Sequence, residues 1–190
     1  MFLTLITFLP LFGALFLVFM PKESVAAIKQ TALAIAGTDF LLSIFLWTNF
    51  DNTSHKMQFE LNVPWIEAWG INFHVGLDGI SLLLYVMTTF LTMICVIASW
   101  DVKIHVREYM IAMLTLSTGM LGVFIALDLF MFYVFWEFQL IPMYIIIGVW
   151  GGPRRVYASI KFFLFTAVGS LLMLVAILWI YLHIQETTGV

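Results

Sequence analysis

Long apolar runs dominate this sequence and limit what it can fold into. A helix that crosses a bilayer needs about 20 mostly apolar residues. We expect about six membrane-spanning helices, over residues 2–20, 28–50, 79–100, 109–127, 129–150 and 157–183. Hydrophobic residues make up 63% of the chain and charged residues 10%, whereas a soluble domain carries about 25% charged residues. The sequence therefore predicts an all-α integral membrane protein.

The apolar runs follow one another without a linker, an internal repeat or a low-complexity segment. We therefore expect a single transmembrane domain over residues 1–190. The first run is not a convincing signal peptide, because the nearest basic residue, Lys22, follows the run instead of preceding it. The eight Lys and Arg residues are scattered, which argues against a nucleic-acid partner and leaves the lipid bilayer as the expected surrounding.

Residues that could hold a redox centre are scarce. The chain has one cysteine, Cys95, which offers no disulfide framework, iron–sulfur ligation or zinc cluster. Of the four histidines, His55, His74 and His105 lie outside the expected helices, and His183 is at the end of the last one. We therefore predict no metal and no cofactor in this chain, and we expect any associated redox chemistry to occur in another chain.

The basic residues predict the orientation of the helices in the membrane. If the N-terminus lies outside, six of the eight basic residues fall at the inner side: Lys22, Lys29, Lys103, Arg107, Arg154 and Arg155. Lys56 would then lie outside, and Lys161 would lie within the last helix. Inner loops of membrane proteins carry an excess of Lys and Arg, so we expect the N-terminus and the tail after His183 outside.

The longest loop, 51–78, is expected on the outer side. Its stretches "MQFELNV" and "INFHV" alternate apolar and polar residues, which is typical of half-buried strands. Between them "PWIEAWG" holds a Pro, a Gly and two Trp residues, which favour a turn at the membrane interface. We predict a small β-hairpin. Asp78 and Asp128 precede the third and fifth helices, where Asp is a preferred N-cap.

Glu137 stands alone in the apolar stretch "FYVFWEFQLIPMY". It lies roughly 13 Å below the outer end of its helix, too deep for its carboxylate to reach water along the helix. Either desolvation keeps Glu137 protonated as a packing residue, or a cation from another helix pairs with it near water. Tyr133 and Tyr144 share its face, and Pro142 leaves the Phe138 carbonyl without a donor and kinks the helix. These features favour a proton-relay site.

Three further ionisable residues lie within or near expected helices. Lys161 is roughly 9 Å from the inner end of its helix, so it can either serve proton transfer or extend to the interface. It lies at a different depth from Glu137, which argues against a direct ion pair. Asp39 is near the middle of the second helix, where it either serves proton transfer or is satisfied by Thr38, Ser43 or a neighbouring chain. His183 is either an interfacial residue or a proton exit.

These residues carry a resemblance. "FWEFQLIPMYIIIGVWG", "ASIKFFLFTAVGSLLML" and "FHVGLDGISLLLYVMTTFLT" resemble subunit M, also called chain 4, the antiporter-like proton-pumping subunit of respiratory complex I (NADH–quinone oxidoreductase). The resemblance implies that Glu137 is the proton-translocating glutamate of helix five and that Lys161 is an inner-side position. It also implies partner subunits in the membrane, among them homologous antiporter-like subunits. FMN, iron–sulfur clusters and quinone are expected in partner subunits of the complex.

Members of this family have about fourteen helices, so the chain corresponds to the N-terminal part of a larger bundle. The lysine of helix seven that partners the glutamate in the family is absent from these residues. Two other readings stay open: a cation/proton antiporter or membrane-hydrogenase subunit of the same superfamily, and a structural fragment that moves nothing. We expect a bacterial inner membrane, with an organellar inner membrane as the alternative.

Overall fold

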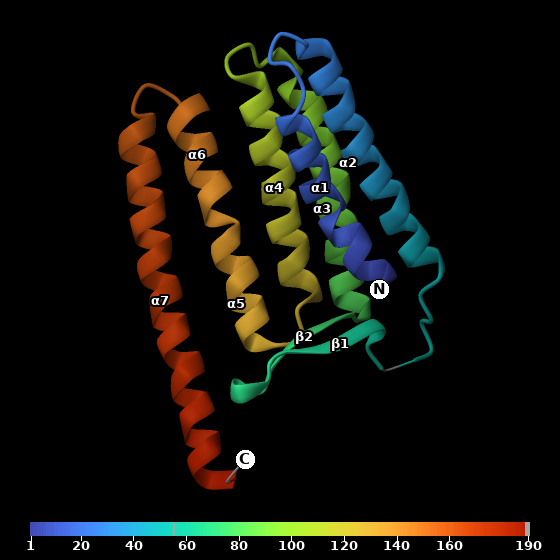
Figure 1. Cartoon of the computed structure of the whole chain (residues 1–190), viewed down its shortest axis with the longest axis vertical. Coiled ribbons are helices and arrows are strands. Elements are labelled where there is room, and N and C mark those ends of the chain that lie inside the picture. The colour runs from blue at the N-terminus through green and yellow to red at the C-terminus, as the bar shows by residue number, and fades with distance from the viewer. Residues whose placement is uncertain (55, 189–190) are drawn as a thin grey trace.

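The computed structural model of the chain describes residues 1–54 and 56–188, and the side chains of residue 68 and of residues 184–188 lie outside that description. Figure 1 shows helices standing side by side, with a short hairpin across one end. The helices are α1 (Phe2–Val18), α2 (Val25–Thr48), α3 (Gly79–Ala98), α4 (Val106–Ile125), α5 (Leu129–Phe138), α6 (Leu140–Trp150) and α7 (Arg155–Thr188). Short 3-10 turns occupy Glu67–Trp69 and Ser99–Asp101.

The predicted apolar runs are helical. Within the described residues, five helical stretches are long and apolar enough to span a bilayer, and α5 and α6 together form one of them. The remaining helix, α1, has 17 residues, which is about 26 Å at 1.5 Å per residue. The chain is a multi-pass integral membrane protein, as the sequence predicts.

Several helix boundaries differ from the prediction by two to five residues, and α4 begins at Val106 instead of residue 109. α2 begins at Val25 instead of residue 28, because the Ile28 N–H donates to the Ser24 carbonyl (3.0 Å) and closes the first turn earlier. α7 continues to Thr188, since no Gly or Pro interrupts it after Gly169. The helix expected over 129–150 is divided at Gln139.

The predicted β-hairpin is present. β1 (Gln58–Ile66) pairs antiparallel with β2 (Ile71–Leu77), and Gly70 closes the turn in a left-handed conformation (φ 65°) that glycine adopts without strain. The Leu127 N–H donates to the His74 carbonyl (2.9 Å), which ties β2 to the junction between α4 and α5. The hairpin therefore rests on the ends of the helices.

The first four helices form one packed bundle, and α5, α6 and α7 pack along one side of it. α1 packs on α2 and α4, and α3 packs on α2 and α4. α4 also contacts α5 and α6, whereas α7 packs mainly on α6 and, to a smaller extent, on α5. Gly119 and Gly122 let α5 approach α4 closely, because a Cβ on Gly119 would lie 3.0 Å from the Gln139 Cβ and one on Gly122 would overlap the Phe135 ring.

Two buried hydrophobic clusters fill the first bundle, one above the other. The hairpin-side cluster consists of Leu3, Ile6, Leu46, Val75, Leu77, Leu82, Tyr85, Val86, Leu121 and Ile125. The far-side cluster consists of Ala14, Leu17, Ile28, Ala32, Ala36, Val96, Val106, Met110 and Leu114. Each of the four helices contributes to both clusters, so the core is divided along the length of the helices.

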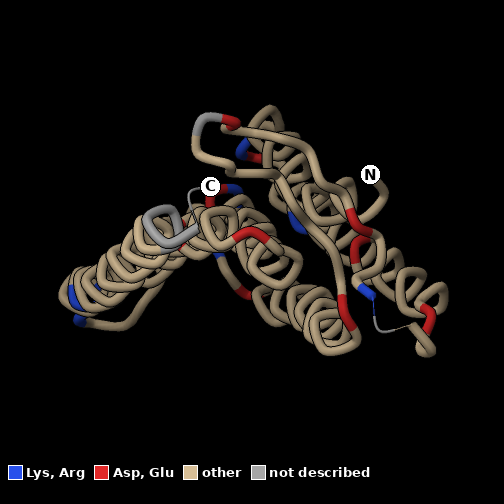
Figure 2. The backbone as a smooth tube through the Cα atoms, turned by 90° about the horizontal axis from the view of Figure 1, so that it is seen from below, with Lys and Arg blue, Asp and Glu red and all other residues tan. Residues whose placement is uncertain are grey.

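Charged residues are few along the helices, as Figure 2 shows in a view from the hairpin end. The loops opposite the hairpin are basic and are held by ion pairs and hydrogen bonds. Lys22 pairs with Glu108 (3.1 Å), and Arg107 donates to the Val18 and Met20 carbonyls (both 3.1 Å). Lys29 is buried there and donates to the carbonyls of Trp100 and Val102. The basic residues thus fix the turns at this end.

Candidate functional site

Glu137 lies in the last turn of α5 and is half-buried. Its Oε1 atom is shielded from solvent and has no hydrogen-bond partner among the described residues. Phe135 and Gln139 face α4, where they meet its two glycines. Because residues two positions apart lie about 200° apart around a helix, Glu137 is on the side of α5 that faces away from α4.

The helical pattern is interrupted at Gln139, two residues after Glu137, although Gln139 itself keeps helical dihedral angles (φ −71°, ψ −19°). α5 ends at Phe138 and α6 begins at Leu140. Pro142 has no N–H to give to the Phe138 carbonyl, and the N–H of Gln139 and that of Met143 reach their acceptors at 3.3 Å. A break inside a bilayer is tolerated where protein or a water-filled cavity covers it. The carboxylate and loosened backbone carbonyls therefore occur together.

The two predicted tyrosines have different surroundings. Tyr133, one turn before Glu137, is close enough to interact with its carboxylate electrostatically. Tyr144 is 38% exposed, and its ring packs edge-on against Phe163 of α7 at 5.6 Å between centroids. The structure thus brings Tyr133 to Glu137, while Tyr144 serves the contact between α6 and α7.

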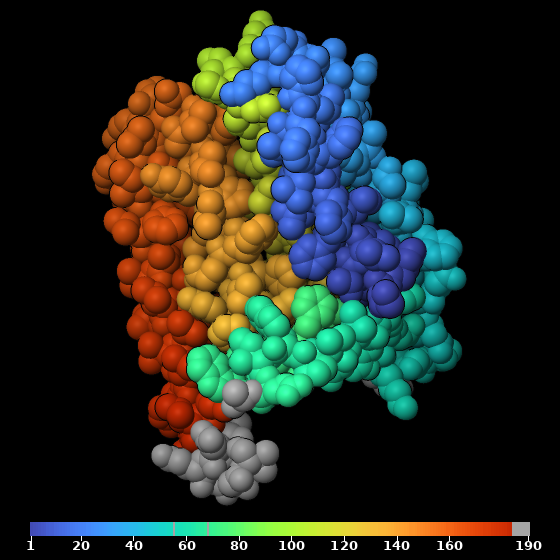
Figure 3. Space-filling model, in the orientation of Figure 1, coloured from blue at the N-terminus to red at the C-terminus, as the bar shows by residue number. Residues whose placement is uncertain are grey.

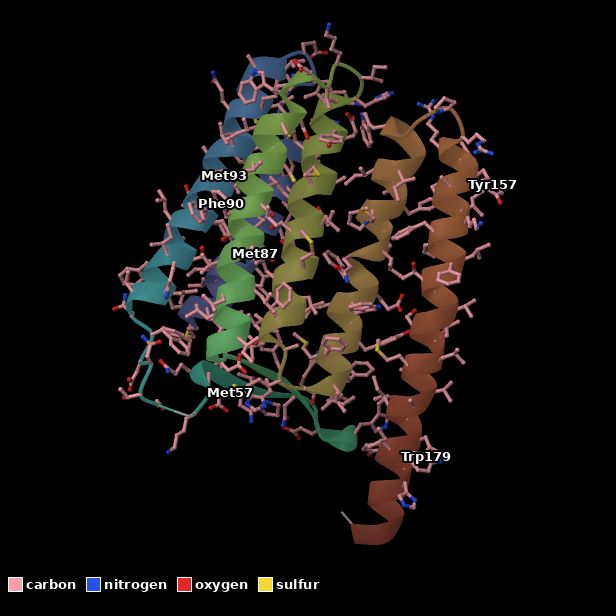
Figure 4. All side chains as sticks on the ribbon, turned by 180° about the vertical axis from the view of Figure 1, so that it is seen from behind. Met57, Met87, Phe90, Met93, Tyr157 and Trp179 are labelled. Carbon is pink, nitrogen blue, oxygen red and sulfur yellow. The ribbon has the colours of Figure 1, made fainter. Side chains whose placement is uncertain are left out.

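Lys161 lies on the exposed side of α7. Its Nζ is 5.9 Å from the centroid of the Tyr157 ring, one turn earlier on the same helix. Figure 4 shows Tyr157 on the side of α7 that faces away from the other helices. Phe163, two residues after Lys161, faces α6 instead. Lys161 therefore does not meet Glu137 in this structure, which agrees with the expectation that the two form no direct ion pair.

Asp39 is buried in the first bundle, with 1% of its surface exposed. Its Oδ1 atom has no hydrogen-bond partner in the described part of the chain. Thr38, expected as a possible partner, donates instead to the Ala34 carbonyl (2.7 Å). Ser43 donates to the Phe40 carbonyl (2.7 Å) and contacts the Thr89 hydroxyl (2.8 Å). Two carboxylates within the helices, Asp39 and Glu137, thus each keep an oxygen without a donor.

Both predicted helix caps form. Asp78 Oδ1 accepts from the Ser81 N–H (2.7 Å), and this bond holds the pKa of Asp78 below its usual value. Asp128 Oδ1 accepts from the N–H groups of Phe130 (2.8 Å) and Met131 (3.1 Å). His183, near the end of α7, stacks on Trp179 with 5.1 Å between ring centroids. The caps fix where α3 and α5 begin.

Comparisons with known proteins match this arrangement. Residues 126–189 match the family described as "NADH:quinone oxidoreductase/Mrp antiporter, TM". The chain is 46% identical over 189 residues to NADH-quinone oxidoreductase subunit M of Rhodobacter capsulatus, covering 97% of this chain and 36% of the relative. It is 44% identical over 181 residues to NADH-ubiquinone oxidoreductase chain 4 of Marchantia polymorpha, covering 94% and 37%.

Over more than nine-tenths of its length the chain is similar to proteins of the subunit M/chain 4 family. A chain of respiratory complex I from Thermus thermophilus with bound NADH superposes with a TM-score of 0.79 at 32% identity, covering 94% of this chain and 35% of that one. The Mrp complex from Dietzia sp. DQ12-45-1b gives 0.79 at 19% identity, covering 98% and 20%, which shows a shared fold alone. The chain spans about a third of the length of these subunit M relatives.

The described residues contain no group of three or more His, Cys, Asp or Glu side chains placed to hold a metal ion. Cys95 is exposed, and no second thiol is present. The donor set of this chain therefore does not fit an iron–sulfur cluster.

A set of buried hydroxyls in the first bundle was not predicted from the sequence. We call this set, together with Asp39, the polar layer: Thr7, Asp39, Ser43, Thr88, Thr89, Thr92, Ser117 and Thr118. On each helix these residues lie between the members of the two hydrophobic clusters. The adjacent Thr and Ser residues inside two apolar runs, "TTFLT" and "LST", were the available signal. Buried Lys29, treated as a loop charge, was also missed.

Proposed function

We propose that this chain is a membrane subunit of NADH–quinone oxidoreductase that translocates protons as electrons pass from NADH to quinone elsewhere in the complex. Glu137 takes up and releases the translocated proton. The observation that carries the proposal is a half-buried carboxylate, whose Oε1 has no donor among the described residues, two residues before the interruption of the helix at Gln139. The sequence identity to subunit M supports the same activity.

A carboxylate in a low-dielectric site changes its protonation readily when a neighbouring charge changes. The break after Glu137 offers loosened carbonyls that water can bridge. Tyr133 adds a hydroxyl that can accept one proton and donate another. Glu137 is therefore suited to hold a proton in one state of its neighbours and to release it in another.

The partner subunits hold the redox groups in this proposal. FMN and iron–sulfur clusters carry the electrons there, and quinone is reduced there. Homologous antiporter-like subunits are the expected neighbours in the membrane. Lys161, exposed on α7, faces further protein in the assembled complex and passes protons from the inner side.

The orientation follows from charge. The basic turns opposite the hairpin lie on the inner side, and the hairpin and the N-terminus lie outside. The inner membrane of a bacterium is the proposed location, since bacterial subunit M proteins are among the relatives, with an organellar inner membrane as the alternative.

Replacement of Glu137 by Gln in the assembled complex tests the proposal. The variant keeps the shape of the side chain but cannot carry the translocated proton. We expect proton uptake into vesicles to collapse and coupled quinone reduction to fall, while the complex still assembles. Glu67→Gln, in the exposed hairpin turn, is the matched control and retains both activities. Unchanged proton uptake in Glu137→Gln vesicles would reduce Glu137 to a packing residue.

A cation/proton antiporter subunit is the second candidate, favoured by the family description, which names both kinds of protein. The two candidates differ in their partners and their driving force. Vesicles with the antiporter exchange cations for protons without NADH, whereas the complex I subunit takes up protons only while quinone is being reduced.

A further inference from the structure

The polar layer crosses the first bundle between its two hydrophobic clusters. It takes one residue from α1, two from α2, three from α3 and two from α4. Most of its hydroxyls donate to a carbonyl one turn earlier, as Thr7 does to Leu3 (3.0 Å) and Thr92 to Thr88 (2.9 Å). Such bonds are ordinary for Ser and Thr in apolar helices. This bonding pattern does not explain the buried carboxyl group of Asp39.

Asp39 is 99% buried, and its Oδ1 has no donor within the described part of the chain. An ionised carboxylate in this position has to give up hydration without full replacement, which is costly. A proton on the carboxyl group removes the charge and supplies an O–H that needs an acceptor. The neighbouring hydroxyls have oxygen lone pairs, so they can provide it.

The charged and titratable groups that face Asp39 are few. α1 contains none, and on α3 the nearest is Tyr85, which interacts electrostatically with Asp39. On α4 the charged residues are Arg107 and Glu108, at the far end of the bundle. Lys29 is ten residues before Asp39 on α2, about 15 Å away along the axis, and is bound to two carbonyls. No described cation therefore neutralises Asp39.

Ser43, one turn after Asp39 on the same face of α2, and its partner Thr89 have more contacts than hydrogens. Ser43 and Thr89 contact each other at 2.8 Å, and each also lies within bonding distance of a carbonyl, Phe40 at 2.7 Å and Val86 at 2.8 Å. Two O–H groups cannot satisfy three contacts at once. Their hydrogens can therefore switch between acceptors, which is what proton transfer along hydroxyls requires.

The layer continues from Asp39 across α3. α2 and α3 run antiparallel, so the residues one turn beyond the Ser43–Thr89 pair, Asp39 and Thr92, lie at about the same level. Thr92 in turn donates to Ser117 of α4 (3.2 Å). Thr88 and Thr92 keep 7% and 6% of their surface exposed, whereas Ser43, Thr89 and Ser117 keep none. The layer thus comes nearest to the molecular surface along α3.

We propose that Asp39 is a second proton-binding site of this chain, which takes up and releases its proton through the hydroxyls of the polar layer. The proposal rests on the proton-translocating function proposed above and adds a site separate from Glu137. On release, the O–H bond of Asp39 breaks and the proton joins a neighbouring hydroxyl or a water molecule, which passes its own proton on. On uptake the same steps run in reverse, and no electron moves.

Glu137 lies on the side of α5 away from α4, while the polar layer ends at Ser117 and Thr118 of α4. The two carboxyl groups are therefore expected to exchange protons independently. This separation allows each site to be tested while the other is intact.

Infrared difference spectroscopy on the assembled complex tests the proposal, because protonated carboxyl groups give a C=O band that shifts when their hydrogen is replaced by deuterium. We expect Asp39→Asn to remove one such band and Glu137→Gln to remove a different one. In heavy water the Asp39 band shifts, and Ser43→Ala or Thr92→Val slows that shift. Thr115→Val removes a hydroxyl of the same kind outside the layer and leaves the rate unchanged.

Several outcomes overturn the proposal. An Asp39 band that neither shifts in heavy water nor changes with pH means a sealed structural carboxyl group. No band lost in Asp39→Asn means that Asp39 is ionised, and a band that appears only when sodium is removed assigns the site to that ion. Where Asp39→Asn fails to assemble, the two hydroxyl variants decide. These readouts do not depend on pumping, so they stand whatever Glu137→Gln shows.

Discussion

The first four helices and the last three differ in how much of their surface this chain buries. Half of the apolar stretch of α4 is buried within the chain, against 6% of that of α7. Figure 3 shows α7 along one edge of the molecule, where large apolar side chains such as Phe165 and Trp179 are exposed. The first bundle has a divided hydrophobic core with Asp39 inside it, while Glu137 lies in a thinner layer of helices. Composition alone does not distinguish these two surroundings.

This difference also separates the two acidic residues. Asp39 is enclosed by side chains of this chain, so its chemistry is set here. Glu137 faces away from the packed bundle, toward a side that this chain covers incompletely. We infer that neighbouring protein completes the surroundings of Glu137 but not those of Asp39.

The contact between α4 and α5 joins the two regions, so a substitution there is the strongest test of the difference between them. Gly122→Leu places a side chain where the Phe135 ring lies, so α5 must move away from α4. We expect the largest loss of stability here, about 1–3 kcal/mol or more for an overpacked site. The measurement is the thermal unfolding of the chain in lipid nanodiscs, followed by circular dichroism.

Gly169→Leu is the control for that experiment, because no atom lies within 4 Å of a Cβ at Gly169 on α7. We expect no loss, since glycine is a poor helix former. Equal destabilisation by both variants would mean that the α4–α5 contact is no tighter than the free surface of α7.

Lys29→Met tests how firmly the first bundle is tied at its basic end. The variant leaves the carbonyls of Trp100 and Val102 without their charged donor. Hydrogen bonds to charged groups contribute about 1.5–3 kcal/mol, so we expect a loss in that range. Lys22→Met removes an exposed ion pair with Glu108 and is expected to cost about 0–1 kcal/mol. The comparison fails if the exposed pair proves the stronger one.

Asp78→Ala removes the N-cap of α3, and the loss of an N-cap costs about 1 kcal/mol. The pKa of Asp78 is lowered chiefly by the Ser81 N–H. Its contribution is therefore complete above the ordinary value of about 3.9 and is lost as the pH falls from there through the folded pKa. Asp78→Asn keeps an acceptor without the charge, so its unfolding should lack this pH dependence. Identical acid profiles for Asp78→Asn and the unmodified chain would contradict this account.

Lys161→Met is expected to have the smallest effect on stability, within about 0.5 kcal/mol, as for most surface substitutions. Its Nζ contacts the Tyr157 ring on an exposed helix face. The same variant in the assembled complex separates the roles: proton uptake should fall while thermal unfolding of the isolated chain stays unchanged. A large loss of stability in the isolated chain would show that Lys161 serves packing within α7.

Local sequence patterns were enough to predict the helices, the hairpin and the two caps. These features depend on local patterns: the length of apolar runs, the alternation in "MQFELNV", and Asp directly before a helix. The sequence also located Asp39 and Glu137, because a carboxylate inside an apolar run is visible without a structure. The break near Pro142 was predicted from the missing N–H, although its position at Gln139 was not.

The surroundings of those residues could be seen only in the tertiary structure. Neighbours across helices depend on register and rotation, which no single run encodes. Thus the sequence could not show that Ser43 meets Thr89, that Thr92 meets Ser117, or that Tyr144 turns to Phe163. Two glycines of α4 set the approach of α5 and so leave Glu137 on its outer side. Packing of whole helices, rather than any local preference, placed one carboxylate inside the bundle and the other beside it.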